Sequence, residues 1–268
     1  RLQIDKSSKS MKRIVLIFII MMSSIASYAI NPTRTYSNTP VKMELEHEVL
    51  RIETKDGISL NVWHLPSSET GTPIIISQSD AGNMGDWLYL GLYLQAYGLD
   101  VWMYDYRGFG ESEDFNIIQN QLFHIEFTED LAAICDYAYS KTGKVPALMG
   151  ISMGTIIVNE YIRKADIPVS HLVFDGYVAD PQKWIDKLAK NGKVVMLPKG
   201  YKNRKYKQKN RNTLFIVAWM EQYSIVAYIP KANADMQHVK VFDCEHISGF
   251  FKQPVEYTET ILAFLNNN

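Results

Sequence analysis

The chain has 268 residues, of which 47% are apolar, and its 28 basic residues nearly balance 29 acidic ones. A net charge of −1 gives no indication of nucleic-acid binding, and two cysteines are too few for a small secreted domain built on disulfides. The length is sufficient for one domain with a large apolar core.

The first feature along the chain is an apolar run at residues 14–22, directly after two basic residues. The run is short for a membrane span, and small residues follow it up to Ala29. This pattern predicts a signal peptide that is cleaved after Ala29, with export to the periplasm or secretion. An uncleaved membrane anchor is the alternative. Residues 1–29 are therefore assigned to an upstream segment plus signal peptide, and residues 30–268 to one domain.

Short apolar runs alternate with helical patterns along the rest of the chain. The runs predict strands at 46–53, 59–65, 73–77, 101–106, 145–148, 172–174, 213–219 and 239–242. The clearest helical patterns are 86–97, 128–140, 153–164 and 254–265. This alternation predicts an α/β fold with a doubly wound, mostly parallel sheet of about eight strands flanked by helices. In such sheets the ligand site lies outside the carboxyl ends of the strands.

The pentapeptide GISMG at positions 150–154 places Ser152 between a predicted strand and a predicted helix. A sharp strand-to-helix turn strains the serine backbone and presses it against its neighbours, so the positions two before and two after can carry no side chain. Gly150 and Gly154 meet this requirement. The pattern predicts that Ser152 is a nucleophile at the working edge of the sheet, although such a pentapeptide also arises by chance.

A nucleophilic serine needs a base within hydrogen-bond reach, and the chain has six histidines. Three of them precede Ser152, while His171 and His238 stand at the starts of predicted strands, on the opposite edge of the sheet. His246 follows the last predicted strand at its carboxyl end. It is therefore the predicted base, with an ordinary surface-loop histidine as the alternative.

The two cysteines are expected to be buried thiols. Cys135 lies on the apolar face of a predicted helix, and Cys244 stands beside a late strand. Export would permit a bond between them, and the sequence leaves that question open.

These motifs, in this order, resemble the α/β-hydrolase family over nearly the whole of residues 30–268. The segment YDYRGFGES at positions 104–112 is similar to the D-x-R-G-x-G-x-S turn that these enzymes often carry. The resemblance implies a serine esterase, lipase or acyl-peptidase that needs no metal or organic cofactor. It also implies a short lid inserted after the sixth strand, at about residues 177–212.

The family binds the oxyanion of the tetrahedral intermediate with two backbone N–H groups. Carried over to this chain, the donors are those of Met153 and Ser79. The second loop departs from the family, because Gln78-Ser79 stands where relatives usually have His-Gly. The charge of Asp80 would oppose a developing oxyanion unless it points away. The alternative is that Asp80 orders the loop.

The resemblance implies that a carboxylate orients the catalytic histidine from the loop after strand 213–219. No aspartate occurs there, and Glu221 is the carboxylate of that loop, so Glu221 is the predicted acid. Asp175, at the end of strand 172–174, is the fallback, followed by Asp180. If neither serves, a Ser-His pair with diminished turnover remains.

The predicted lid is basic and rich in tyrosine, and no acidic residue occurs between Lys187 and Met220. Such a flap favours an anionic substrate or peripheral contact with an anionic membrane. A solvated loop that only aids solubility is the alternative.

Together these features predict an exported serine hydrolase that cleaves a carboxylic ester, thioester or small amide of a small-molecule acyl substrate, with lipids included. Ser152 attacks, His246 transfers the proton and Glu221 orients His246. The alternative is a catalytically silent binding protein with the same fold, suggested by the altered acid and oxyanion loops.

Overall fold

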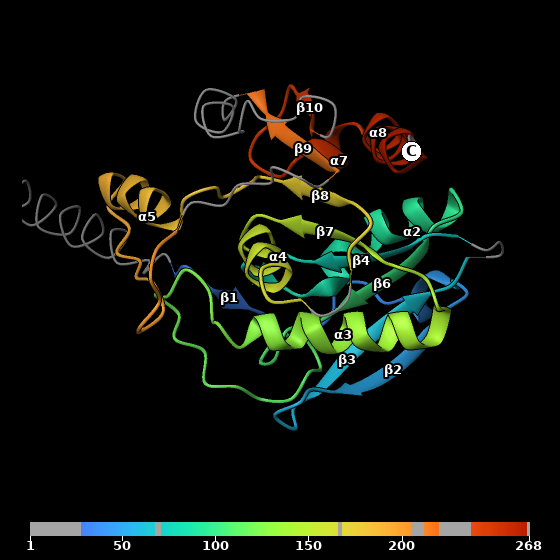
Figure 1. Ribbon diagram of the computed structural model, residues 1–268, viewed down its shortest axis with the longest axis horizontal. Helices are drawn as coiled ribbons and strands as arrows, with labels where there is room; N and C mark the ends of the chain where they lie inside the picture. Colours follow the sequence, from blue (N-terminus) through green and yellow to red (C-terminus); the bar gives the residue numbers. More distant parts are fainter. Residues whose placement is uncertain (1–27, 68–70, 166–167, 205–211, 220–236, 267–268) are drawn as a thin grey trace, which may run out of the picture.

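The computed structural model describes residues 28–67, 71–165, 168–204, 212–219 and 237–266. At its centre is an eight-stranded sheet with the order β10-β9-β8-β7-β4-β6-β3-β2 (Figure 1). The strands are β2 (Glu48–Glu53), β3 (Ser59–Leu65), β4 (Pro73–Ser77), β6 (Asp100–Tyr104), β7 (Ala147–Ile151), β8 (Leu172–Asp175), β9 (Thr213–Ala218) and β10 (Gln237–Phe242). Two short strands, β1 (Asn31–Pro32) and β5 (Ala81–Gly82), pair with each other outside this sheet.

The sheet is mostly parallel, as the sequence predicts. The strands from β10 to β6 pair in parallel, whereas β3 pairs antiparallel with both β6 and β2. The strand β7 extends three residues beyond its predicted end at Leu148, because Gly150 and Ile151 still pair with β8. This extension brings Ser152 directly to the end of the strand.

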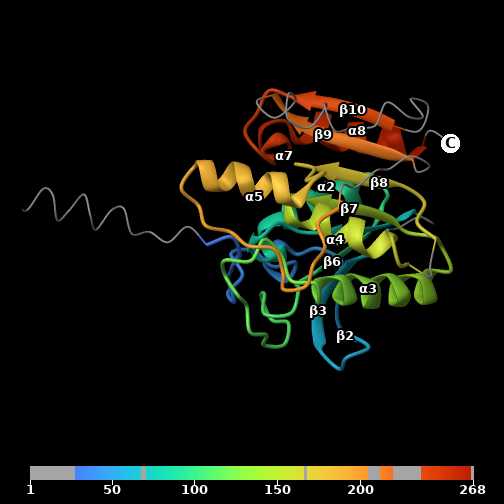
Figure 2. The ribbon, with the colours of Figure 1, turned by 60° about the vertical axis from the view of Figure 1, so that its left-hand side comes forward.

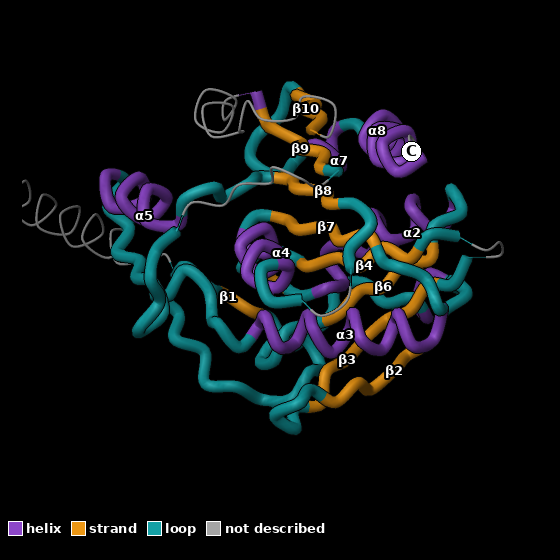
Figure 3. Tube along the Cα trace, viewed as in Figure 1, coloured by secondary structure: helices purple, strands orange, loops and turns teal. Residues whose placement is uncertain are grey.

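Helices cover both faces of the sheet (Figures 1 and 3). The helices are α2 (Leu88–Ala96), α3 (Phe127–Thr142), α4 (Met153–Ile162), α5 (Pro181–Lys190), α7 (Gly249–Lys252) and α8 (Pro254–Asn266), with 3-10 turns η1 (Val41–Met43) and η2 (Met84–Trp87). The helices α3 and α4 pack in one apolar layer, and α2 and α8 pack in the other. In the ranges that the structure describes, no helix has both the length and the hydropathy to cross a bilayer.

The two thiols lie in different apolar layers. Cys135 on α3 belongs to the layer with α4, and Cys244 belongs to the layer with α2 and α8. Both are buried, and no disulfide joins them. Burial raises the pKa of the Cys135 thiol to about 12, which disfavours the thiolate at neutral pH.

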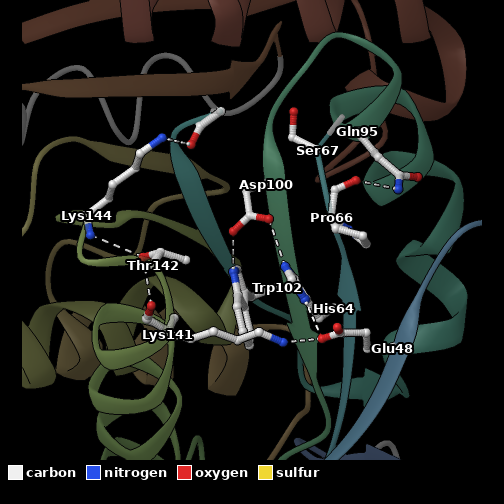
Figure 4. Close-up of polar contacts among 12 residues, drawn as sticks. Glu48, His64, Pro66, Ser67, Gln95, Asp100, Trp102, Lys141, Thr142 and Lys144 are labelled. Carbon is white, nitrogen blue, oxygen red and sulfur yellow. Dashed lines mark hydrogen bonds and ion pairs between the residues drawn. The ribbon is translucent and has the colours of Figure 1, made fainter. Parts of the chain in front are cut away.

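A polar cluster around His64 ties the antiparallel edge of the sheet to its neighbours (Figure 4). His64 on β3 lies between two carboxylates, with Nε2 at 2.7 Å from Asp100 and Nδ1 at 3.0 Å from Glu48. The Trp102 indole donates to the other Asp100 oxygen at 2.8 Å, and Lys141 on α3 pairs with Glu48. Ionised carboxylates only accept hydrogen bonds, so this geometry favours an imidazolium in which both ring nitrogens of His64 donate.

This cluster predicts a stability that depends on pH. Burial alone lowers the pKa of His64, but the hydrogen bonds to Asp100 and Glu48 outweigh burial and raise the pKa. The stabilisation is therefore complete below the unfolded pKa of about 6.5 and is lost as pH rises through the higher folded pKa. At pH 6, His64→Gln should lower the free energy of unfolding by about 1–3 kcal/mol, with a smaller effect at pH 9. Chemical denaturation at both values of pH measures this difference.

The control for this prediction is His47→Gln. The His47 ring contacts the backbone carbonyl of Leu45 at 2.7 Å rather than a carboxylate. If both variants showed the same pH dependence as the unaltered protein, His64 would not be the charged link that the geometry indicates.

Candidate active site

Ser152 occupies a sharp turn between β7 and α4. Its backbone has φ 51° and ψ −111°, an unusual conformation for a residue with a side chain. The Ser152 N–H donates to the carbonyl of Asp175 at 2.8 Å, which fixes the turn against β8. The serine side chain thus lies at the carboxyl edge of the sheet and at the N-terminus of a helix.

The two glycines around Ser152 are required by close backbone packing. A Cβ on Gly154 would lie 2.0 Å from the carbonyl oxygen of Ser77 at the end of β4. A Cβ on Gly150 would lie 2.8 Å from the carbonyl oxygen of Gly154. Both contacts are far shorter than a carbon–oxygen contact allows, so the structure supports the steric reading of the pentapeptide.

The structure brings His246 against Ser152. His246 lies between β10 and α7, and its Nε2 is 3.0 Å from the Ser152 Oγ, within hydrogen-bond distance. The Trp184 ring of α5 covers the imidazole, with ring centroids 5.9 Å apart. The base and nucleophile that the sequence predicts therefore meet, although 94 positions separate them.

Gly176 supports the position of His246 and was not identified from the sequence. Its φ is +66°, and a Cβ there would lie 2.5 Å from the His246 Cε1 and 2.8 Å from the Ile247 Cγ2. The signal in the sequence is a glycine directly after Asp175 at the end of a predicted strand.

We expect Gly176→Ala to displace His246 from Ser152 and to lower kcat about 10- to 100-fold, since misplacement of a catalytic group by about 1 Å has effects of this size. Steady-state kinetics on an activated ester measure the loss. Gly143→Ala is the matched control, because Gly143 has φ +67° and a Cβ there would meet nothing within 4 Å. Both variants carry a backbone cost of about 1 kcal/mol. Equal kcat in the two variants would mean that Gly176 does not position His246.

The two predicted oxyanion donors follow adjacent strands at the same edge of the sheet. Met153 is the first residue of α4, directly after Ser152, and Ser79 follows the end of β4. The strands β4 and β7 pair at Ser77 and Gly150, so the two backbone segments run beside each other as they leave the sheet. The positive end of the α4 dipole also favours negative charge at this point.

Asp105 braces residues 78–83, here called the oxyanion loop because they include the predicted donor Ser79. The sequence motif at positions 104–112 did not reveal this contact. The Gln78 side chain donates to the Asp105 carboxylate at 3.2 Å, which directs its bulk toward Asp105. The same carboxylate accepts the Met84 N–H at 2.8 Å and the Tyr36 hydroxyl. Burial raises the pKa of Asp105 to about 6. The side chain of Gln78 is thus held against Asp105 in the loop that follows β4.

Asp80 contacts the chain before it and also lies at the pocket. Its backbone carbonyl accepts the Asn31 N–H at 2.8 Å, which orders the loop, and its side chain lines the pocket beside Ser152. Burial raises the pKa of the Asp80 carboxyl, while the charges of His246 and Lys193 act in the opposite direction.

The three carboxylates considered for orienting His246 lie at different places in the chain. Glu221, the predicted acid, lies outside the described residues. Asp175 is buried at the end of β8, where its Oδ2 accepts the Tyr257 hydroxyl at 2.8 Å. Asp180 caps α5 by accepting the Lys183 N–H at 3.2 Å, as expected for an aspartate before the first turn of a helix.

A pocket of about 180 Å³ opens beside Ser152 and His246. Its apolar lining comes from several segments that are distant in sequence, and Asp80 and Lys193 add charge. The lining residues are Tyr28, Ala29, Asp80, Leu122, Ser152, Met153, Ile156, Val178, Trp184, Leu188, Lys193, Val195 and His246. A mostly apolar pocket beside the predicted nucleophile suits an acyl group.

The helix α5 belongs to the segment predicted as a lid, and it contributes Trp184 and Leu188 to the pocket. The described part of the basic segment packs against α4, because Glu160 contacts Arg204 at 3.6 Å and accepts the Tyr201 hydroxyl at 3.1 Å. Residues 205–211, which carry the remaining basic side chains of the segment, lie outside the described residues. Among the residues that the structure describes, no group of three or more His, Cys, Asp or Glu side chains could hold a metal ion.

Comparison with known proteins places this site in context. The profile of the family described as serine aminopeptidase, S33 matches residues 81–222, which include Ser152. An esterase of Pyrococcus furiosus, Pf2001, superimposes with a TM-score of 0.68 at 17% identity, covering 88% of this chain and 98% of the esterase. At this identity the likeness shows a shared fold.

Two curated relatives match by sequence. The uncharacterized membrane protein YNL320W of Saccharomyces cerevisiae is 31% identical over 81 residues, which are 30% of this chain and 28% of that protein. The uncharacterized protein YfhR of Salmonella typhimurium is 28% identical over 150 residues, which are 53% of this chain and 48% of that protein. The matches thus span between about a quarter and a half of these relatives.

Proposed function

Because the chain belongs to the α/β-hydrolase family described as serine aminopeptidase, S33, we propose that it is a serine hydrolase acting through an acyl-enzyme on Ser152. The bond cleaved is a carboxylic ester, a thioester or a small amide. The observation that supports this most directly is the 3.0 Å contact between the His246 Nε2 and the Ser152 Oγ.

In the proposed first step, the Ser152 Oγ attacks the substrate carbonyl carbon while its proton passes to the His246 Nε2. The carbonyl π electrons move to oxygen, and the N–H groups of Met153 and Ser79 stabilise this oxyanion. The oxyanion then re-forms the carbonyl, the bond to the leaving group breaks, and His246 returns the proton to that group. Water repeats the sequence on the acyl-enzyme and releases the acid.

Substrate class follows from the pocket and the charge around it. The apolar lining from α4 and α5 supports an acyl group, and Lys193 in the same lining supports an anionic or polar leaving part. The basic segment after α5 extends this preference to anionic lipids at a membrane surface. The apolar run at residues 14–22 supports export through a signal peptide, with cleavage after Ala29.

The test of this proposal is covalent labelling with a fluorophosphonate probe, which reacts only with an activated serine. Folded protein should be labelled, and mass spectrometry should locate the adduct at Ser152. Heat-denatured protein is the control, because the contact with His246 exists only in the fold. Absence of labelling in folded protein would instead support the silent binding protein suggested by the altered oxyanion loop.

A further inference from the structure

Residues 28 and 29 form part of the wall of the candidate pocket. Both line it together with Ser152 and His246. Tyr28 is 49% exposed, whereas Ile30 is fully buried in the apolar layer with α3 and α4. Ala29 is half-buried against the same layer, and its N–H donates to the Gln119 carbonyl at 2.8 Å. The boundary between the exposed pocket wall and the buried core therefore falls at Ala29.

The anchored chain, residues 30–36, is here called the N-terminal strap. Main-chain hydrogen bonds of 2.8 Å from Asn31 to Asp80 and 2.9 Å from Thr33 to Gly82 pair β1 with the oxyanion loop. The Asn83 side chain adds bonds of 2.9 Å and 3.3 Å to carbonyls of the strap. These bonds hold the strap without any contribution from Tyr28 or Ala29.

The cleavage site predicted from the sequence falls at this boundary. A cut after Ala29 removes two residues from the pocket wall and leaves every strap bond in place. The nitrogen of Ile30, which donates to the Gln119 carbonyl at 3.0 Å, would keep that partner as an ammonium group. In Figure 2 the blue start of the described chain lies at the same end of the molecule as α5, which also contributes residues to the pocket lining.

The pocket is small, so removal of residues 28 and 29 would change its volume appreciably. A volume of about 180 Å³ lies below the range of about 300–1,000 Å³ that is usual for small-molecule sites. Loss of the Tyr28 side chain and of two backbone units would enlarge the pocket on one side, while the apolar walls from α4 and α5 remain. The space gained would lie beside apolar groups and would accept additional methylene groups of an acyl chain.

We propose that Tyr28 and Ala29 are a removable wall of the acyl pocket, so that cleavage of the leader after Ala29 extends the length of acyl chain that the site accepts. The inference rests on the proposed function, because it concerns the same Ser152-centred site. The uncleaved chain is selective for short acyl groups, and the chain that begins at Ile30 also accepts medium-length groups.

The test compares the full chain, produced without export so that the leader is retained, with a chain whose first residue is Ile30 after proteolytic removal of a tag. The measured quantity is the ratio of kcat/KM for p-nitrophenyl octanoate to kcat/KM for p-nitrophenyl acetate. This ratio should be about tenfold higher, or more, in the chain that begins at Ile30. Equal ratios in the two chains overturn the proposal.

A point variant tests the wall when the shortened chain does not fold. Tyr28→Ala in the full chain should raise the ratio in the same direction, by about threefold, because the side chain is removed but the backbone remains. Tyr89→Ala is the matched control, since Tyr89 on α2 is 46% exposed and does not line the pocket. A ratio in Tyr28→Ala equal to that of the control counts against the wall.

Two further measurements separate the possible failures. If the fluorophosphonate probe labels Ser152 in both chains but the octanoate-to-acetate ratio of kcat/KM is the same in both, the inference is wrong and the proposed function stands. Absence of labelling in both chains removes the proposed function and the inference with it. Mass spectrometry of the exported protein should find Ile30 at the N-terminus, and retention of Tyr28 after export overturns the processing step.

Discussion

Ser152→Ala is expected to abolish fluorophosphonate labelling and to lower kcat on a short p-nitrophenyl ester by about 10⁴-fold or more. The substitution removes the Oγ that lies 3.0 Å from the His246 Nε2, so the base has no proton to take. Folding should be preserved, because alanine and serine meet the same backbone cost at φ 51° and the backbone bond to Asp175 remains. Circular dichroism together with steady-state kinetics checks both expectations.

The control for this prediction is Ser140→Ala on α3. The Ser140 hydroxyl donates to the Tyr137 carbonyl at 2.8 Å within its own helix, and Ser140 is not among the residues that line the pocket. Its loss should leave labelling and kcat within about twofold of the unaltered protein. Activity retained in Ser152→Ala would remove Ser152 from the mechanism.

The parts of the fold that follow local rules could be predicted from the sequence. Strands β3 and β4 have the predicted bounds. The strand β4 is a short apolar run, and β3 follows the turn signal Lys55-Asp56-Gly57. The glycines at 150 and 154 indicate the turn around Ser152, since close packing there depends on neighbours that are near in sequence. Position at a strand end was enough to select His246, because parallel strands place their carboxyl ends at one edge.

The supporting contacts could not be predicted, because they depend on pairings between distant segments. Asp105 braces the oxyanion loop through Gln78 and Met84, and neither the spacing nor the residue types indicate that contact. Likewise, nothing in the sequence shows that residues 30–36 pair with the oxyanion loop. A two-residue strand such as β1 is too short for any periodic pattern to identify.

The third member of the proposed triad is where the chain departs most from its family. Glu221 is within the segment 81–222 that the family profile matches, whereas His246 is beyond it. Asp175 contacts the turn through its backbone, since its carbonyl accepts the Ser152 N–H at 2.8 Å, and its carboxylate accepts the Tyr257 hydroxyl. An amide at position 175 would keep both contacts, because its oxygen can still accept from Tyr257.

If Glu221 orients His246 as proposed, Glu221→Gln should lower kcat by a factor of about 10² to 10⁴, and Asp175→Asn should have a small effect. A glutamine keeps the shape of the loop but cannot stabilise the imidazolium that forms on His246 as Ser152 attacks. The measurement is kcat of both variants and the unaltered protein on one activated ester, with each fold checked by thermal unfolding. Near-normal kcat in Glu221→Gln beside a collapse in Asp175→Asn would identify Asp175 as the acid, and two normal values would leave a Ser-His pair without a third member.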